Sequence, residues 1–182
     1  MVTGPNYIFV STPKCATNTM YSVLPKHFFG KRYGGFHCNR PPRRATWKHT
    51  WTIVRNPFDR AVSIWGSTCC NPRYAYWRLA GGKDFGTFAA WLAKHPKMDN
   101  PVTRPMHDWL SGIRLDSVIH IEHLEDELKG LPFWREVPLP KLNTHPHSEW
   151  PVYYKDAKII ADIRTWAGKD FDMFGYEAEF AV

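Results

Sequence analysis

The feature that most constrains the fold of this chain is a strand, a broken loop and a helix in immediate succession near its start. Residues 7–11 form a short, mostly apolar run of strand-forming types. Residues 12–16 contain Pro13 and are too short and too irregular to continue that strand. Residues 17–28 place apolar side chains at helical spacing. A strand that turns directly into a helix is the usual opening of an α/β domain, so we expect that fold class.

Later segments supply candidates for further strands and helices. Residues 50–54 are apolar and β-branched and stop at Arg55, and residues 117–121 have a similar character. A short strand is also expected around residues 33–37. Helices are expected from Pro57 onward, over residues 85–94 behind the capping residue Asp84, over residues 122–128, and over residues 153–166 with Gly168 as the terminator.

Length and composition narrow the class of protein. A chain of 182 residues suggests one domain, and 43% hydrophobic with 23% charged residues makes disorder a poor interpretation. No apolar run approaches the roughly 18–20 residues that a membrane span needs, and the start lacks the pattern of a secretory signal. We therefore expect a cytoplasmic protein whose four cysteines, Cys15, Cys38, Cys69 and Cys70, stay reduced.

The charge balance indicates an anionic partner. The sequence has 24 Lys and Arg against 17 Asp and Glu, which gives a net charge of +7. A basic surplus of this size favours nucleic acid, phosphorylated cofactors or acidic polymers, without choosing among them.

The loop after the first strand has the composition of an anion site. The free N–H groups in the first turn of a helix, with the helix dipole behind them, attract negative charge. Lys14 adds a full positive charge, and Thr17, Asn18 and Thr19 add side-chain donors. The segment is not a Walker A loop, because the pattern G-x-x-x-x-G-K-[ST] is absent. A surface lysine followed by an ordinary helix cap is the alternative interpretation.

A second candidate anion site follows the strand at residues 50–54. Arg55 falls at the carboxyl end of that strand, which is the usual ligand-binding edge of an open α/β sheet. Ser63 lies about two turns into the next helix, so both side chains can reach one phosphate. The alternative is that Arg55 and Arg60 merely pair with Asp59.

These segments resemble those of a known family, the sulfotransferases. STPKCATN at residues 11–18 resembles their 5′-phosphosulfate loop, and VRNPFDRAVS at residues 54–63 resembles their 3′-phosphate motif. IHIEHLED at residues 119–126 and DFDMFGY at residues 170–176 are similar to segments of carbohydrate-type members. One departure is that the Gly common in the first loop is Ala16 here, which is strained if that position needs a positive φ and harmless if it already begins the helix.

The resemblance implies a single three-layer α/β domain over residues 1–182, with a parallel sheet and a fold related to P-loop kinases. It implies an enzyme that binds 3′-phosphoadenosine-5′-phosphosulfate (PAPS) and transfers its sulfuryl group to a hydroxyl or amine of a small molecule or glycan. The product is adenosine 3′,5′-bisphosphate (PAP), and no metal is needed because Lys14 and the helix supply the positive field. The cofactor-binding residues would be Lys14, Cys15, Ala16, Thr17, Asn18, Thr19, Arg55 and Ser63.

Sulfuryl transfer also needs a base for the acceptor proton, for which the family uses His or Glu. His is suited to this near neutral pH. His37 is our candidate, because it follows the expected strand at residues 33–36 and lies between the two cofactor motifs. His107 is the second candidate, whereas His49 is expected at the opposite end of its strand and Glu122 lies in a segment whose match is structural.

Two other classes of protein remain as alternatives. One is a small P-loop-like kinase or nucleotide-binding protein, against which stand the missing Walker pair and the lack of an evident magnesium-holding Asp after a strand. The other is a non-enzymatic nucleic-acid-binding domain, for which the sequence carries no recognisable signature. Metal binding is not expected, since His37/Cys38, Cys69/Cys70 and His145/His147 lack zinc-site spacing.

Overall fold

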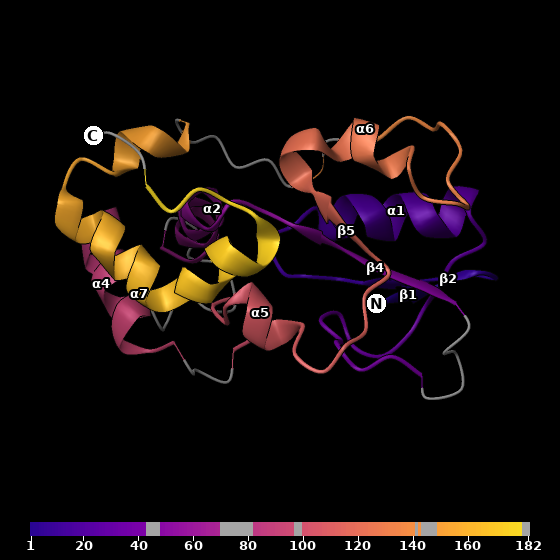
Figure 1. Cartoon of the computed structure of the whole chain (residues 1–182), viewed down its shortest axis with the longest axis horizontal. Coiled ribbons are helices and arrows are strands. Elements are labelled where there is room, and N and C mark those ends of the chain that lie inside the picture. The colour runs from indigo at the N-terminus through magenta and orange to yellow at the C-terminus, as the bar shows by residue number, and fades with distance from the viewer. Residues whose placement is uncertain (43–47, 70–81, 97–99, 141, 143–148, 180–182) are drawn as a thin grey trace. The chain divides into compact units, whose positions relative to one another are not determined.

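The computed structural model describes residues 1–42, 48–69, 82–96, 100–140, 142 and 149–179 (Figure 1). The chain falls into two compact units. The sheet unit comprises Met1–Arg55 and Trp109–Thr144, and the helical unit comprises Asn56–Asp108 and His145–Val182. The expectation of one domain over residues 1–182 stays a prediction. No helix in the described part of the chain is long and apolar enough to cross a membrane.

The sheet unit is built on a mixed sheet with strand order β3-β1-β2-β4-β5. Strands β2, β4 and β5 run parallel, with Val10 opposite Thr52 and Thr52 opposite Val118. Strand β1 runs antiparallel to both β2 and β3. The described strands are β1 (Val2–Thr3), β2 (Tyr7–Val10), β3 (Lys31–Arg32), β4 (His49–Val54) and β5 (Ser117–His120).

The α/β class is confirmed, and the expected parallel sheet is present in part: β2, β4 and β5 are parallel, whereas β1 makes the sheet mixed. Only three residues connect β1 to β2, which is too short for the crossover that parallel strands need. The connection is a tight turn in which the Gly4 N–H donates to the Tyr7 carbonyl at 2.9 Å. A Cβ at Gly4 would lie 2.0 Å from the Tyr7 ring, so this turn requires glycine.

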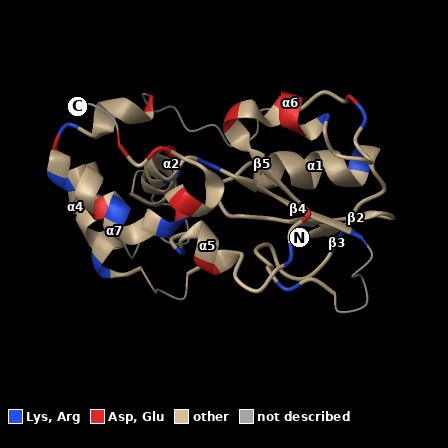
Figure 2. Cartoon of the chain, in the orientation of Figure 1, with Lys and Arg blue, Asp and Glu red and all other residues tan. Residues whose placement is uncertain are grey.

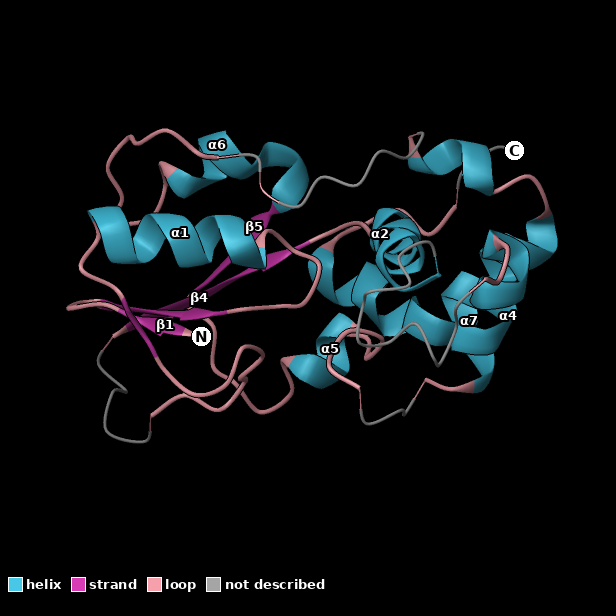
Figure 3. Cartoon of the chain, turned by 180° about the vertical axis from the view of Figure 1, so that it is seen from behind, coloured by secondary structure: helices cyan, strands magenta, loops and turns pink. Residues whose placement is uncertain are grey.

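Two helical elements accompany the sheet. Helix α1 (Thr17–His27) and helix α6 (Leu124–Leu128), which follows the short 3₁₀ turn η1 (Ile121–His123), lie on the same side of the strands (Figure 3). The two central strands are fully buried from Ile8 to Val10 in β2 and from Trp51 to Val54 in β4. This burial explains the apolar runs by which the two strands are recognised in the sequence.

The prediction of a strand at residues 33–37 is wrong. The strand in this region is β3, at Lys31–Arg32, and residues 33–37 are irregular. Gly34 has a φ of 72°, and a Cβ there would lie 2.6 Å from the Cys38 Sγ. The chain therefore turns at this glycine instead of extending the sheet.

The helical unit packs its helices around one aromatic core. Helix α4 lies along α7, and α2 packs against both α4 and α7. Phe58, Phe88, Ile163, Trp166 and Phe171 are among the core residues that these helices bury. The elements are α2 (Pro57–Cys69), α4 (Phe85–Lys94), α5 (Met106–Trp109, whose last residue belongs to the sheet unit), η2 (Trp150–Tyr153) and α7 (Ala157–Phe174).

The helix boundaries show where capping residues act. The Asp84 side chain accepts the Thr87 N–H at 3.0 Å, which confirms it as the N-cap of α4. Helix α7 joins two helical stretches across a kink at Ala167 (φ −127°, ψ 25°), so the first stretch ends beside Gly168, where the sequence predicts an end. The second stretch continues to Phe174 and is capped by Gly175 with a φ of 69°.

Candidate functional site

The loop between β2 and α1 is a compact turn held by one carbonyl group. The Thr12 carbonyl accepts the Cys15 N–H at 3.2 Å and the Thr17 hydroxyl at 3.0 Å. Lys14 and Ala16 both adopt left-handed backbone conformations, with φ values of 68° and 52°. Ala16 is the N-cap of α1, so this position does need a positive φ and its alanine is strained.

This strain gives a prediction for the variant Ala16→Gly. Glycine adopts a positive φ without the Cβ clash but adds freedom to the unfolded chain, and we expect a net gain of about 0.5–1 kcal/mol in the free energy of unfolding. Urea denaturation of the two proteins measures this difference in the free energy of unfolding. Ala161→Gly, at an exposed site within α7, is the control and should instead lose about 1 kcal/mol. A destabilised Ala16→Gly protein would contradict the strain.

The first turn of α1 carries backbone N–H groups that precede the first helical hydrogen bond. Ala16 makes no side-chain capping bond, and the Met20 N–H donates to the Ala16 carbonyl at 3.0 Å as the helix begins. The N–H groups before Met20 therefore lie at the positive end of the helix dipole without a capping side chain. Thr17 turns its hydroxyl back to Thr12, and Thr19 donates its hydroxyl to the Pro140 carbonyl at 3.1 Å. Both threonines thus stabilise the loop in addition to offering backbone donors.

Arg55 lies against this loop. Strands β2 and β4 are parallel neighbours, so the segments that follow them leave the sheet at the same edge. The hydroxyls of Thr12 and Thr52 lie 2.8 Å apart, and Thr52 also donates to the Val10 carbonyl at 2.8 Å. Beyond them, the Arg55 Nη1 donates to the Lys14 carbonyl at 3.3 Å. The structure therefore brings together the two basic residues that the sequence places in separate motifs.

Ser63 belongs to the helical unit. It lies half-buried on α2. Its pairing with Arg55 at one phosphate stays a prediction. On the same helix, Arg60 is fully buried and donates to the carbonyls of Val102 and Arg104 at 3.0 and 2.8 Å, so its guanidinium holds the helical unit together.

The N-terminal third of the chain, as far as Phe58, carries basic charge only. The first 58 residues contain nine Lys and Arg and no Asp or Glu. The acidic residues of the sheet unit fall within residues 116–136, and several lie on or beside α6 (Figure 2). The segments that carry Lys14 and Arg55 are therefore positive, as an anion site requires.

Comparison of this chain with known proteins identifies no relative. No family model, no curated protein and no solved structure matches this chain. The interpretation of the site therefore rests on its own residues and geometry.

Trp109 contacts both the His37 ring and the residue that follows β2. The Trp109 indole N–H donates to the Ser11 carbonyl at 3.0 Å, and the Asn39 amide donates to the Trp109 carbonyl at 2.7 Å. The His37 ring stands edge-to-face with Trp109 at 6.5 Å and with Phe36 at 4.8 Å. The half-buried imidazole is thus held in place by aromatic contacts, although its segment is a loop instead of the expected strand. Its role as the base stays a prediction.

His107 occupies a different environment. Its Nδ1 lies 2.7 Å from the fully buried Asp170 carboxylate, and its Nε2 lies 3.2 Å from Asp108. The hydrogen bond to Asp170 raises the pKa of His107. Asp170 also accepts the backbone N–H groups of Met106 and His107, both at 2.8 Å. Because both ring nitrogens lie against carboxylates, His107 is poorly placed to accept a proton from a substrate, and the geometry favours a structural link between α5 and α7.

The other candidates are located as follows. His49 begins β4, at the end opposite Arg55, and its Nε2 lies 2.9 Å from the Ser117 hydroxyl. Glu122 is an exposed residue of η1. Cys15 and Cys69 are buried, and Cys38 is half-buried. Among the described residues, no group of three His, Cys, Asp or Glu side chains is arranged to hold a metal ion, whereas Cys70, His145 and His147 lie outside that part of the chain.

Sequence reasoning missed two residues that organise this site. Trp109 connects the end of β2 to the His37 segment, and Thr52 ties β4 to the loop through Thr12. Both contacts join residues more than 35 positions apart, so no local pattern indicates them. The only local signal is that Thr52 is a polar residue inside an otherwise apolar strand.

Proposed function

We propose that this chain is a PAPS-dependent sulfotransferase, which moves a sulfuryl group from the donor nucleotide to a hydroxyl or amine acceptor, with glycans among the candidate acceptors. The observation that carries the proposal is the hydrogen bond from Arg55 to the Lys14 carbonyl, at the edge where β2 and β4 end. It unites the two segments that resemble the nucleotide-binding motifs of the family. The uncapped start of α1 and the absence of acidic residues before Asp59 support it.

Each residue has a defined role in this reaction. Lys14 and the N–H groups at the start of α1 hold the 5′-phosphosulfate, and Arg55 holds the 3′-phosphate. The acceptor oxygen or nitrogen attacks the sulfur as the bond from sulfur to the bridging phosphate oxygen breaks. PAP leaves with that electron pair, and Lys14 stabilises the charge that develops on its phosphate. His37 takes the proton that the acceptor loses.

The variant His37→Ala tests the base. We expect the rate of sulfuryl transfer to fall about 10²–10⁴-fold, the usual contribution of general-base catalysis, while the affinity for PAP is unchanged. Steady-state rates and calorimetric titration with PAP measure the two quantities. His123→Ala, at an exposed position, is the control and should keep the normal rate. A normal rate in His37→Ala would remove His37 from the mechanism.

Titration with three nucleotide ligands tests the function itself. PAP at about 100 times its dissociation constant should stabilise the protein by about 2.7 kcal/mol, which raises the Tm by roughly 5–10 °C. ATP and single-stranded DNA at matched concentrations should give smaller shifts. Stabilisation by ATP alone would favour the kinase alternative, and stabilisation by DNA alone would favour a nucleic-acid-binding domain.

A further inference from the structure

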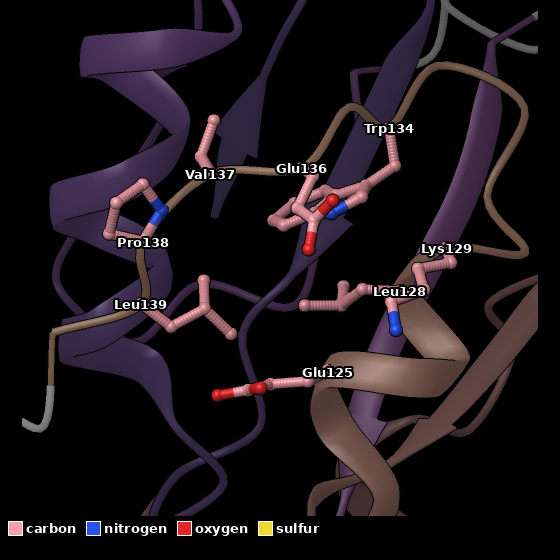
Figure 4. A pocket seen from close by; sticks show the side chains of 8 residues that line it. All are labelled: Glu125, Leu128, Lys129, Trp134, Glu136, Val137, Pro138 and Leu139. Carbon is pink, nitrogen blue, oxygen red and sulfur yellow. The ribbon is translucent and has the colours of Figure 1, made fainter.

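A pocket of about 330 Å³ lies in the sheet unit, between α6 and residues 134–139 (Figure 4). Leu128 extends from α6 and Leu139 from the opposite wall, and the two side chains point toward each other across it. Leu128 is fully buried and Leu139 is half-buried. The indole of Trp134 forms a further wall and stacks on the buried Phe28 ring, with centroids 4.5 Å apart and planes at 19°. The apolar walls of the pocket are therefore held in place by the core.

Two carboxylates face this apolar space. Glu125 points from α6 toward Leu139, and the carboxylate of Glu136 lies in front of the Trp134 indole (Figure 4). Neither carboxylate accepts a hydrogen bond or forms an ion pair within the described part of the chain. Two like charges beside an apolar surface repel each other and attract a cation.

The single cation among the described residues that line the pocket is already engaged. The Lys129 Nζ lies 2.8 Å from the Asp126 carboxylate, one turn back on the exposed side of α6. Residues 122–127 contribute four acidic side chains, so the potential around α6 is negative although the whole chain is positive. An anionic ligand is disfavoured at this pocket on the same ground.

We propose that this pocket binds a small organic cation, namely a protonated amine that carries an apolar or aromatic body. The ammonium lies between Glu125 and Glu136, where the face of the Trp134 indole adds a cation–π contact. The apolar body packs between Leu128 and Leu139. The argument uses none of the residues assigned to sulfuryl transfer, so the proposal is independent of that function.

Three indole compounds of similar size test the charge preference on the whole chain by isothermal titration calorimetry. Tryptamine is cationic, tryptophol is neutral and indole-3-propionate is anionic at pH 7. We expect tryptamine to bind at least tenfold more tightly than tryptophol and indole-3-propionate not to bind. Failure of tryptamine to bind, or equal affinity for tryptamine and tryptophol, overturns the proposal. Binding of an arginine-rich peptide without tryptamine overturns it too, in favour of a protein partner.

Charge variants then locate the site. The double variant Glu125→Gln with Glu136→Gln should lose the preference for tryptamine over tryptophol, whereas Glu177→Gln, an exposed carboxylate of the helical unit, should keep it. Lys129→Gln should tighten tryptamine binding several-fold, because the charge of Lys129 also interacts at longer range with Glu125 and Glu136 and opposes a second cation there. A misfolded protein does not gain affinity, so this variant separates the site from a folding defect. Unchanged or weaker binding in Lys129→Gln contradicts the proposal.

Discussion

Replacing Lys14 with Ala is expected to lower the rate of sulfuryl transfer by about 10²–10³-fold. The leaving phosphate gains negative charge as the sulfur–oxygen bond breaks, and removing one well-placed donor to such a charge costs about 3–4 kcal/mol of transition-state stabilisation. The Lys14 backbone would lose no partner, because the contact from Arg55 is made to its carbonyl group. Release of PAP from radiolabelled PAPS, measured at saturating donor, gives the rate.

Lys26→Ala is the matched control for this measurement. Lys26 is exposed in the last turn of the same helix, so its loss changes the net charge equally without touching the loop. We expect a rate within about twofold of the unsubstituted protein. If Lys14→Ala and Lys26→Ala show the same small change, Lys14 has no part in the chemistry.

The second large effect is expected from Asp170→Asn, on stability. The buried Asp170 carboxylate accepts two backbone N–H groups and the His107 ring, and an amide presents an N–H₂ group to one of these donors. We expect a loss of about 3 kcal/mol in the free energy of unfolding, as is typical when one partner of a buried charge pair is removed. Asp172→Asn, exposed on the same helix, should change it by less than about 0.5 kcal/mol. Equal stability of the two variants would contradict this role.

The same contact predicts a pH dependence. The pKa of His107 is raised in the folded protein, mainly by its hydrogen bond to Asp170. The folded state therefore binds the proton more tightly, and this contribution is complete below the ordinary pKa of about 6.5 and is lost as the pH rises through the folded value. Urea titrations at several pH values should show stability falling across that window. Asp170→Asn should flatten the fall, and an unchanged slope would contradict the assignment.

The parts of the fold that the sequence predicted are those with local signals. The helix Phe85–Lys94 was predicted from the Asp84 cap, which bonds within its own turn. Strand β1 has only two residues and exists through its pairing with Ile8 and Phe9, so no pattern of its own indicates it. The stop predicted at Gly168 corresponds to the kink at Ala167, and the sequence does not indicate that a second helical stretch follows to bury Phe171 and Phe174.

The residues of the candidate site also divide into those that a local sequence pattern indicates and those that only distant contacts position. The sequence places Lys14 and Arg55 at the ends of two strands, and parallel pairing then makes them neighbours. The left-handed conformation of Ala16 was one of two open alternatives, because alanine itself carries no signal for a positive φ. Trp109 was missed, since its bond to Ser11 spans 98 positions and depends on how the chain returns to the sheet.

The measurement that tests the account most directly is a crystal structure of the protein with PAP bound. The account predicts that the 5′-phosphate contacts the Lys14 ammonium and the N–H groups at the start of α1, and that the Arg55 guanidinium contacts the 3′-phosphate. A nucleotide bound elsewhere on the protein, with the loop at residues 14–18 and Arg55 both free of it, would contradict the proposed function.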